Sequence, residues 1–159
     1  MIIAVIGGDP APEDALVHAE AIGREIALRG HVLICGGRGG VMEAACKGAS
    51  EAGGLTIGVL PDSDRSAVNP YVQIPIVTGM GRARNLTLVL SAGAVIAVDG
   101  GYGTLSEIAF ALQHARPVAG LGTWRLETSA GEGVPIFRTD DPVEAVAWAM
   151  AAATGTPHP

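Results

Sequence analysis

Short apolar runs alternate with segments of helical periodicity along this sequence. The first run, residues 2–6, is continuous and rich in β-branched side chains, which is typical of a strand buried on both faces of a sheet. In the segment that follows, Ala19, Ile22, Gly23 and Ile26 repeat at the spacing of one helix face. We expect further strands over residues 32–35, 55–60, 71–77, 94–98 and 118–121, with helices between them and a closing helix over residues 143–150.

This alternation predicts an α/β protein, because strand–helix–strand units are right-handed and place neighbouring strands in parallel. We expect a single-domain, Rossmann-like, three-layer fold with helices on both faces of a mostly parallel sheet of about five to seven strands. A length of 159 residues is that of about one domain. We assign residues 1–152 to this nucleotide- or phosphate-binding domain and residues 153–159 to a flexible tail.

Each of three predicted strands ends in a cluster of glycines. Gly7 and Gly8 follow the first strand, the run Gly36-Gly37-Arg38-Gly39-Gly40 follows the second, and the run Gly100-Gly101-Tyr102-Gly103-Thr104 follows the strand over residues 94–98. In parallel sheets, ligands bind at the carboxyl ends of the strands, near the point where the strand order reverses. This coincidence predicts a binding site at one edge of the sheet that includes all three clusters.

Phosphate is the ligand group that such turns favour. Glycines allow the backbone to approach a ligand closely, and the helix that follows offers unpaired N–H groups at its positive end. We expect Gly100, Gly101, Tyr102, Gly103 and Thr104 to bind a phosphate, and Gly36, Gly37 and Gly39 to contribute with Arg38 as a charge partner. The alternative is a tight turn without a ligand. Neither run is a Walker motif, because no Lys-Ser or Lys-Thr pair follows the glycines.

Two charged residues leave alternatives open. Glu107 stands three residues after Thr104, so it is either the second member of a helix capping box or a carboxylate that faces the ligand as a general acid or base. Arg84 stands near the start of a mostly apolar helix, and it is either a solvated side chain or part of the site. Spacing alone favours the capping box for Glu107 and does not decide for Arg84.

Charge and cysteine content exclude several classes of function. The net charge is −6, and the ten basic residues are scattered, which argues against nucleic acid as a partner. No apolar run approaches the roughly 20 residues of a transmembrane helix, and the N-terminus resembles a strand rather than a signal peptide. Cys35 and Cys46 form no disulfide framework and no metal-ligand spacing. We therefore expect a cytoplasmic protein without a metal site that binds a small phosphorylated ligand.

The two long glycine motifs carry a family resemblance. The runs Gly36-Gly37-Arg38-Gly39-Gly40-Val41-Met42-Glu43-Ala44-Ala45 and Gly100-Gly101-Tyr102-Gly103-Thr104-Leu105-Ser106-Glu107 resemble the LOG (LONELY GUY) superfamily, long labelled lysine decarboxylase-like. The chain is most similar to the short branch that contains the molybdenum cofactor carrier proteins. The resemblance extends from about residue 2 to residue 124. It implies a Rossmann-like fold and a homodimer or homotetramer.

The resemblance also implies roles for particular residues. The cytokinin-activating members hydrolyse the N-glycosidic bond of N6-substituted adenosine 5′-monophosphates, and Arg84 and Glu107 match their catalytic Arg and Glu. Gly100, Gly101, Gly103 and Thr104 match their phosphate-binding turn. Three positions differ from that motif: Asp99 replaces a proline, Asn85 replaces a lysine, and Leu88 replaces a methionine. We expect Asn85 to contact the ligand from the position of that lysine.

Two functions follow as alternatives. Because both Arg84 and Glu107 are present, the sequence narrowly favours a nucleoside 5′-monophosphate phosphoribohydrolase, which releases free base and ribose 5-phosphate. The alternative is a carrier that binds molybdenum cofactor, a phosphorylated pterin, without catalysis, and the changes at Asp99 and Asn85 favour it. Neither function requires a further cofactor, although AMP-like nucleotide, phosphate or molybdenum cofactor is the expected bound molecule.

Overall fold

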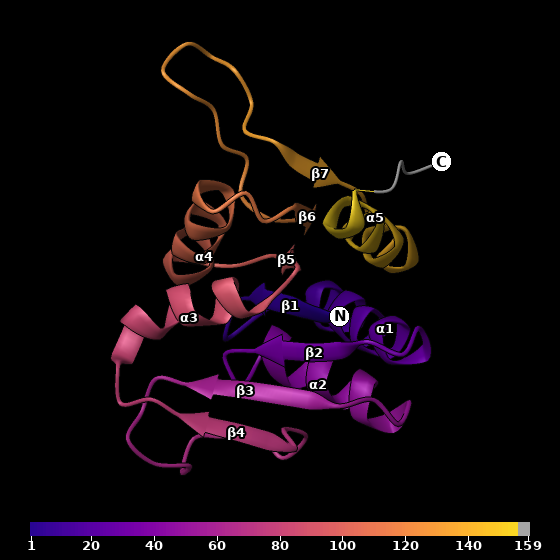
Figure 1. Ribbon diagram of the computed structural model, residues 1–159, viewed down its shortest axis with the longest axis vertical. Helices are drawn as coiled ribbons and strands as arrows, with labels where there is room; N and C mark the ends of the chain where they lie inside the picture. Colours follow the sequence, from indigo (N-terminus) through magenta and orange to yellow (C-terminus); the bar gives the residue numbers. More distant parts are fainter. Residues whose placement is uncertain (156–159) are drawn as a thin grey trace.

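The computed structural model describes residues 1–155 of the chain. Its elements alternate as the periodicity predicts (Figure 1). The strands are β1 (Ile2–Gly7), β2 (Val32–Cys35), β3 (Thr56–Leu60), β4 (Ile74–Val77), β5 (Ala94–Val98), β6 (Val118–Leu121) and β7 (Ile136–Arg138). The helices are α1 (Glu13–Leu28), α2 (Val41–Glu51), α3 (Arg84–Ser91), α4 (Tyr102–Gln113) and α5 (Pro142–Thr154), with a 3₁₀ turn, η1 (Gly81–Ala83), before α3.

The seven strands form one sheet in the order β4-β3-β2-β1-β5-β6-β7, and every pair of neighbours in it is parallel. The chain builds outward from β1 on one side as far as β4, then returns to add β5 on the other side of β1. The strand order therefore reverses between β1 and β5, where a doubly wound sheet opens a crevice for ligands. The predicted α/β, mostly parallel fold is confirmed.

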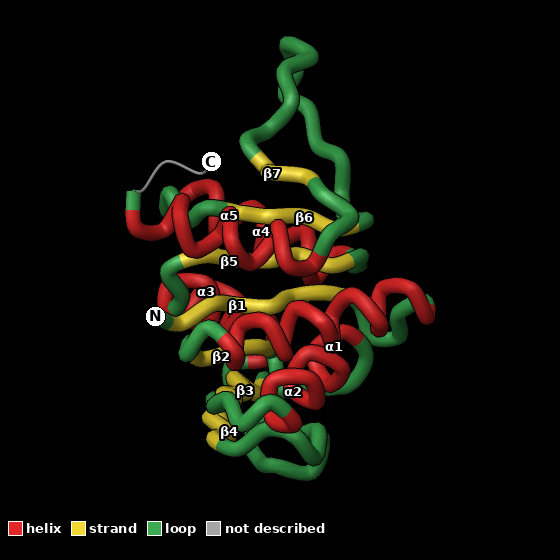
Figure 2. The backbone as a smooth tube through the Cα atoms, turned by 90° about the vertical axis from the view of Figure 1, so that its right-hand side faces the viewer, coloured by secondary structure: helices red, strands yellow, loops and turns green. Residues whose placement is uncertain are grey.

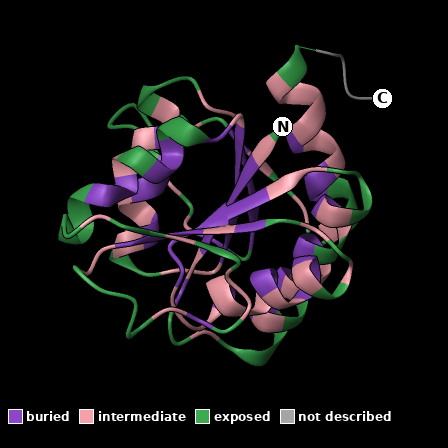
Figure 3. Cartoon of the chain, turned by 60° about the horizontal axis from the view of Figure 1, so that its bottom comes forward, coloured by how far each residue is buried: buried purple, intermediate pink, exposed green. Residues whose placement is uncertain are grey.

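Helices cover both faces of the sheet (Figures 1 and 2). Helices α1, α2 and α5 pack on one face in a cluster with Ile3, Val5 and Ile96, and α3 and α4 pack on the other face with Ile6 and Val95. Figure 3 shows buried residues along the central strands and on parts of the helices that flank them. All five residues of β5 are buried, as expected of a parallel strand that is covered on both faces.

Helices α1 and α2 approach each other at two glycines. A Cβ on Gly23 would lie 1.9 Å from the carbonyl oxygen of Ala45, and a Cβ on Gly48 would lie 1.9 Å from the carbonyl oxygen of Glu20. Both obstacles are backbone atoms, so only glycine allows this close approach. The contact fixes the position of α2, whose N-terminus lies beside the predicted site.

Several element boundaries differ from the sequence-based expectations. Strand β4 is limited to Ile74–Val77, because Tyr71 and Gln73 are engaged through Thr56 and Asn69 in the turn that precedes it. Strand β7 was not predicted. Helix α5 extends two residues beyond the predicted domain boundary and ends at Gly155, which adopts φ 69; residues 156–159 of the expected tail lie outside the described part.

Over the described residues, no helix is long and apolar enough to cross a membrane. The two cysteines are both free and buried, with their Sγ atoms 3.4 Å apart.

Candidate functional site

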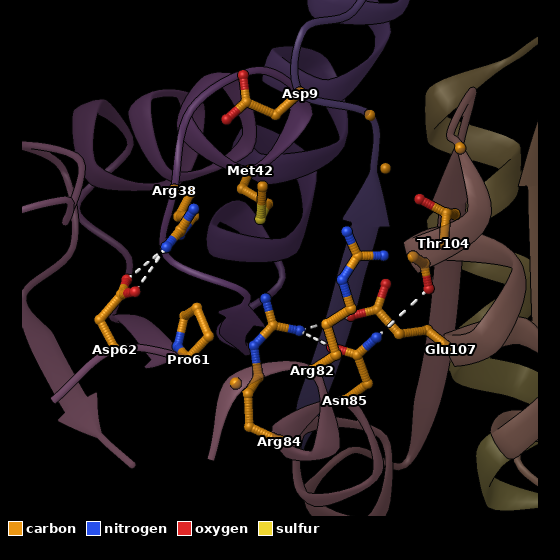
Figure 4. A pocket seen from close by; sticks show the side chains of 15 residues that line it. Asp9, Arg38, Met42, Pro61, Asp62, Arg82, Arg84, Asn85, Thr104 and Glu107 are labelled. Atoms are coloured by element: carbon orange, nitrogen blue, oxygen red, sulfur yellow. Dashed lines mark hydrogen bonds and ion pairs between the residues drawn. The ribbon is translucent and has the colours of Figure 1, made fainter. Parts of the chain in front are cut away.

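A cleft of about 430 Å³ opens at the carboxyl edge of the sheet, at the point where the strand order reverses. Turns after β1, β2, β3 and β5 and the segment that leads into α3 contribute to it (Figure 4). Its walls are formed by Gly7, Gly8, Asp9, Arg38, Met42, Pro61, Asp62, Gly81, Arg82, Arg84, Asn85, Gly101, Gly103, Thr104 and Glu107.

The N-terminus of α4 forms one wall. In the part of the chain that the structure describes, the N–H groups of Tyr102, Gly103 and Thr104 have no backbone or side-chain acceptor, because they belong to the first turn of the helix. Gly100 adopts φ 112, and a Cβ there would lie 2.5 Å from Thr104, so the turn requires glycine. Free N–H groups at the positive end of a helix form a site for an anion such as phosphate.

Arg84 and Glu107 form a buried ion pair at the base of this wall. Arg84 is 8% exposed and Glu107 is 6% exposed, and Arg84 Nη1 lies 3.0 Å from Glu107 Oε1. The Nε atom of Arg84 is buried without a partner among the described residues. The hydrogen bonds of Arg84 to Asn85 and Glu107 both use Nη1, so Nη2 keeps donors that a ligand could use.

Burial controls the ionisation of Glu107. Loss of solvent raises the pKa of this carboxyl to about 7, although the guanidinium of Arg84 acts in the opposite direction. A carboxyl with this pKa exchanges a proton near neutral pH, and in its protonated form it donates a hydrogen bond.

Asn85 and Gly36 hold Arg84 in place. The Asn85 side-chain oxygen accepts a hydrogen bond from Arg84, and its Nδ2 donates to Ser106 Oγ at 2.9 Å. A Cβ on Gly36 would lie 2.5 Å from Arg84 Nη2, so the guanidinium occupies the space above a bare backbone. The position of Arg84 is thus determined by α3, by α4 and by the turn after β2.

The opposite wall of the cleft contains an ion pair, apolar side chains and an unpaired carboxylate. Arg38 Nη2 binds both carboxylate oxygens of Asp62, at 2.7 and 2.6 Å, which ties the turn after β2 to the loop after β3. Met42 and Pro61 add apolar surface. The exposed Asp9 has no hydrogen-bond or ion-pair partner within residues 1–155.

A family model for the SLOG cluster4 family matches residues 1–146. The chain belongs to the SLOG cluster4 family. A protein from Archaeoglobus fulgidus is 46% identical over 146 residues, 92% of each chain. The molybdenum cofactor binding protein from the phototrophic bacterium Rippkaea orientalis is 42% identical, covers 89% of this chain and 90% of its own, and superposes with a TM-score of 0.78. The molybdenum cofactor carrier protein from Chlamydomonas reinhardtii is 40% identical, covers 96% and 98%, and has a TM-score of 0.82.

Membership of the SLOG cluster4 family confirms the superfamily that the two glycine motifs indicate. Of the predicted site residues, the structure brings nine into the cleft: Gly7, Gly8, Arg38, Arg84, Asn85, Gly101, Gly103, Thr104 and Glu107. Gly36, Gly37, Gly39 and Gly100 support the turns without lining it, and Tyr102 is 79% exposed with its ring against Trp124.

The structure of this SLOG cluster4 protein excludes one alternative for each of the two charged residues, Glu107 and Arg84. Helix α4 begins at Tyr102 with Gly101 as its N-cap, so Thr104 lies inside the first turn and the capping box with Glu107 is wrong. Glu107 binds Arg84 instead. Arg84 is buried, so the solvated alternative for this residue is wrong as well.

The three departures from the cytokinin-activating motif have structural explanations. Asn85 links α3 to α4 through Ser106. Leu88 is fully buried in the core. Asp99 adopts φ 50, and its carboxylate oxygen would lie 2.9 Å from a Cβ on Gly8, so the acid lies against the first glycine turn. A carboxylate in this position adds negative charge next to the cleft without lining it.

Sequence reasoning missed six residues of the cleft: Asp9, Met42, Pro61, Asp62, Gly81 and Arg82. Pro61 and Asp62 open the long polar loop over residues 61–69, whose length is itself a signal of function. Arg82 lies two residues before Arg84, in the 3₁₀ turn. Met42 stands inside the first glycine motif, which assigns it no role of its own, and no local pattern marks Asp9, which enters the cleft through the packing of neighbouring turns.

Proposed function

We propose that this protein binds molybdenum cofactor, or a closely similar phosphorylated pterin, as cargo and acts as its carrier. The observation that carries the proposal is the cleft itself, in which the free N–H groups of α4 lie beside the cationic side chain of Arg82. Two solved structures of 40% and 42% identity are described as a carrier of this cofactor and a binding protein for it. Their coverage of almost the whole chain supports the same role here.

The residues of the cleft fit the chemistry of this cargo. A terminal phosphate suits Gly101, Gly103 and Thr104 at the N-terminus of α4, because N–H donors and the helix dipole favour a dianion. Arg82 is exposed and has no partner within the described residues, so its guanidinium is available to the same group. The flat faces of a pterin ring suit the apolar surface of Met42 and Pro61.

Native mass spectrometry of the purified protein tests this proposal directly. We expect a co-purified phosphorylated pterin, or its uptake when the protein is incubated with molybdenum cofactor. Arg82→Ala should weaken uptake by about tenfold or more, through loss of a charge-assisted contact. Arg125→Ala is the matched control, because Arg125 is also exposed but does not line the cleft. Failure of the wild-type protein to bind the cofactor or any phosphorylated pterin would contradict the proposal.

A second candidate, hydrolysis of nucleoside 5′-monophosphates, is favoured by one observation. The buried Arg84–Glu107 pair lines the cleft, where Glu107 could activate water or stabilise an oxocarbenium-like transition state beside a bound phosphate. If the protein is a phosphoribohydrolase, AMP or an N6-modified AMP should yield free base and ribose 5-phosphate. Glu107→Gln should then lower the rate by on the order of a hundredfold or more. If the protein binds the cofactor and hydrolyses none of the common nucleoside monophosphates, the hydrolase function is refuted and the carrier function stands.

We also propose that the chain assembles into a homodimer or homotetramer. Ile74, Ile76 and Val77 are 38–44% exposed on β4, which is an edge strand. Apolar edge strands expose unpaired backbone groups and are usually covered in the native protein. A second copy of the chain would cover this edge.

A further inference from the structure

The cleft is electrically asymmetric. The wall formed by α4 and η1 contains the free N–H groups of α4, the unpaired cation of Arg82 and the neutralised pair of Arg84 with Glu107. The opposite wall contains the neutralised pair of Arg38 with Asp62 and the unpaired carboxylate of Asp9 (Figure 4). Asp99 adds a carboxylate next to the cleft but does not line it, so among the groups that line the cleft the free N–H donors and the unpaired cation lie at one end and the unpaired carboxylate at the other.

The place of Asp9 explains why a phosphate does not suit the turn after β2. A Cβ on Gly39 would lie 3.2 Å from both carboxylate oxygens of Asp9, so the whole carboxylate faces the bare backbone of this turn. A Cβ on Gly40 would lie 2.9 Å from the Asp9 Cα. Asp9 thus places negative charge at the N-terminus of α2, where a helix favours it. This charge favours the N-terminus of α4 as the phosphate end of the cleft, and the expectation that Gly36, Gly37 and Gly39 also contact phosphate stays a prediction.

We propose that Asp9 is a specificity-determining residue that accepts hydrogen bonds from the N–H edge of the ligand's ring. This proposal rests on the proposed function, because it assumes that the phosphate of the same ligand lies at α4. A carboxylate is acceptor-only when ionised, so it recognises a ring edge that offers two adjacent N–H donors. The 2-amino-4-oxo pyrimidine edge of a pterin offers such a pair. A ring with a carbonyl oxygen at the 2-position turns an acceptor toward the carboxylate and is rejected.

Several features of the described residues support this role over a structural one. Among residues 1–155, the Asp9 side chain takes part in no hydrogen bond or ion pair that stabilises the fold. It lines the same cleft as Met42, whose side chain offers an apolar surface to a ring. A site built to bind a donor discriminates strongly against an analogue that lacks it, because the protein group is then left without a partner.

The test uses two matched probes, 6-hydroxymethylpterin monophosphate and 6-hydroxymethyllumazine monophosphate. They share the ring system and the phosphate and differ at the 2-position, which carries an amino group in the pterin and a carbonyl in the lumazine. Isothermal titration calorimetry should show that the wild-type protein binds the pterin at least about tenfold more tightly than the lumazine. In Asp9→Asn, the pterin should bind about tenfold more weakly, and the preference should nearly disappear.

Two controls keep the outcome interpretable. Asp140→Asn makes the same change at an exposed position that does not line the cleft, and it should leave both affinities unchanged. Asp9 makes no hydrogen bond or ion pair in the described fold, and its charge at the N-terminus of α2 contributes only about 0.3–1 kcal/mol at an exposed position, so Asp9→Asn should melt within a few degrees of the wild-type protein. If the wild-type protein binds both probes equally, or if Asp9→Asn keeps the preference, the role of Asp9 is refuted and the proposed function stands. If neither probe binds, the role of Asp9 in binding this ring edge is refuted, and uptake of molybdenum cofactor itself decides whether the proposed function stands.

Discussion

Glu107 couples the protonation of the site to the stability of the fold. Its pKa is raised to about 7 in the folded protein, against 4.5 for the free side chain, because burial disfavours the charged form. Between these two pH values the folded protein binds a proton that the unfolded chain has released. The contribution of Glu107 to the free energy of unfolding is therefore fully present below about pH 4.5. It is lost as the pH rises through about 7, which lowers the free energy of unfolding by up to about 3 kcal/mol.

Glu107→Gln removes this titration while keeping the shape of the protonated carboxyl. We expect the free energy of unfolding of the variant, relative to wild type, to increase by up to about 3 kcal/mol between about pH 5 and about pH 8. Urea denaturation across this pH range measures the difference. Glu132→Gln, in an exposed loop, should run parallel to wild type at every pH. A parallel course for Glu107→Gln as well would show that Glu107 titrates normally.

Gly36 is the second residue whose role is specific to the site. A Cβ there would lie 2.5 Å from Arg84 Nη2 and 2.7 Å from Met42 Sδ, which are the mobile ends of two side chains that line the cleft. Gly36→Ala should displace both and lower ligand affinity by about tenfold or more, while overpacking costs about 1–3 kcal/mol of stability. Binding assays and urea denaturation measure the two effects. Gly133→Ala, which meets no atom within 4 Å, should change neither.

At this scale, the sequence predicts the backbone of the site better than its side chains. The position of Gly101, Gly103 and Thr104 in the cleft could be predicted from the sequence, because a glycine-rich turn into a helix presents free N–H groups that bind an anion. The partner of Glu107 could not be predicted, because its spacing from Thr104 fits a capping box, whereas its actual partner, Arg84, is 23 residues away in the sequence. Asp9 and Arg82 reach the cleft from segments that show no pattern of their own.

Among the elements, α1 and α2 depend on two glycines for their packing. Alanine at Gly48 would be favoured by helix propensity by about 1 kcal/mol if the helix were alone. Its Cβ would instead lie 1.9 Å from the backbone oxygen of Glu20, so the two helices would have to separate. We expect Gly48→Ala to lower the free energy of unfolding by about 3 kcal/mol or more, as measured in urea. An unchanged or higher stability would mean that α2 is not held by this contact.

The strands show where hydrophobic periodicity is sufficient to predict the bounds of an element and where it is not. Strands β1, β2, β5 and β6 have the predicted bounds to within one residue, because buried parallel strands are continuous apolar runs. Strand β7 has only three residues, Ile136–Arg138, and exists because β6 offers it an edge to pair with. Such a strand has no local signal, since its cause is a tertiary contact.

For the whole molecule, the exposed apolar residues of β4 lead to a prediction about assembly. Sedimentation should give a mass near 32 or 64 kDa, which is two or four times the chain mass of 16.0 kDa. Ile76 is 44% exposed, and Ile76→Lys should shift the protein toward the 16.0 kDa species if this edge is the interface. Lysine at the exposed Val17 of α1 is the control. A monomer at micromolar concentration in the wild-type protein would contradict the prediction.

The central position of β1 has a consequence for how the chain is made. Of the strands of this sheet, β1 is made first although it is the middle strand of the finished sheet, and its partner β5 (Ala94–Val98) follows almost ninety residues later. Until then, one edge of β1 remains unpaired, with Ile3 and Val5 not yet covered from that side. Nascent chains that stop before β5 should therefore be bound by chaperones or aggregate, and chains that extend through it should escape both.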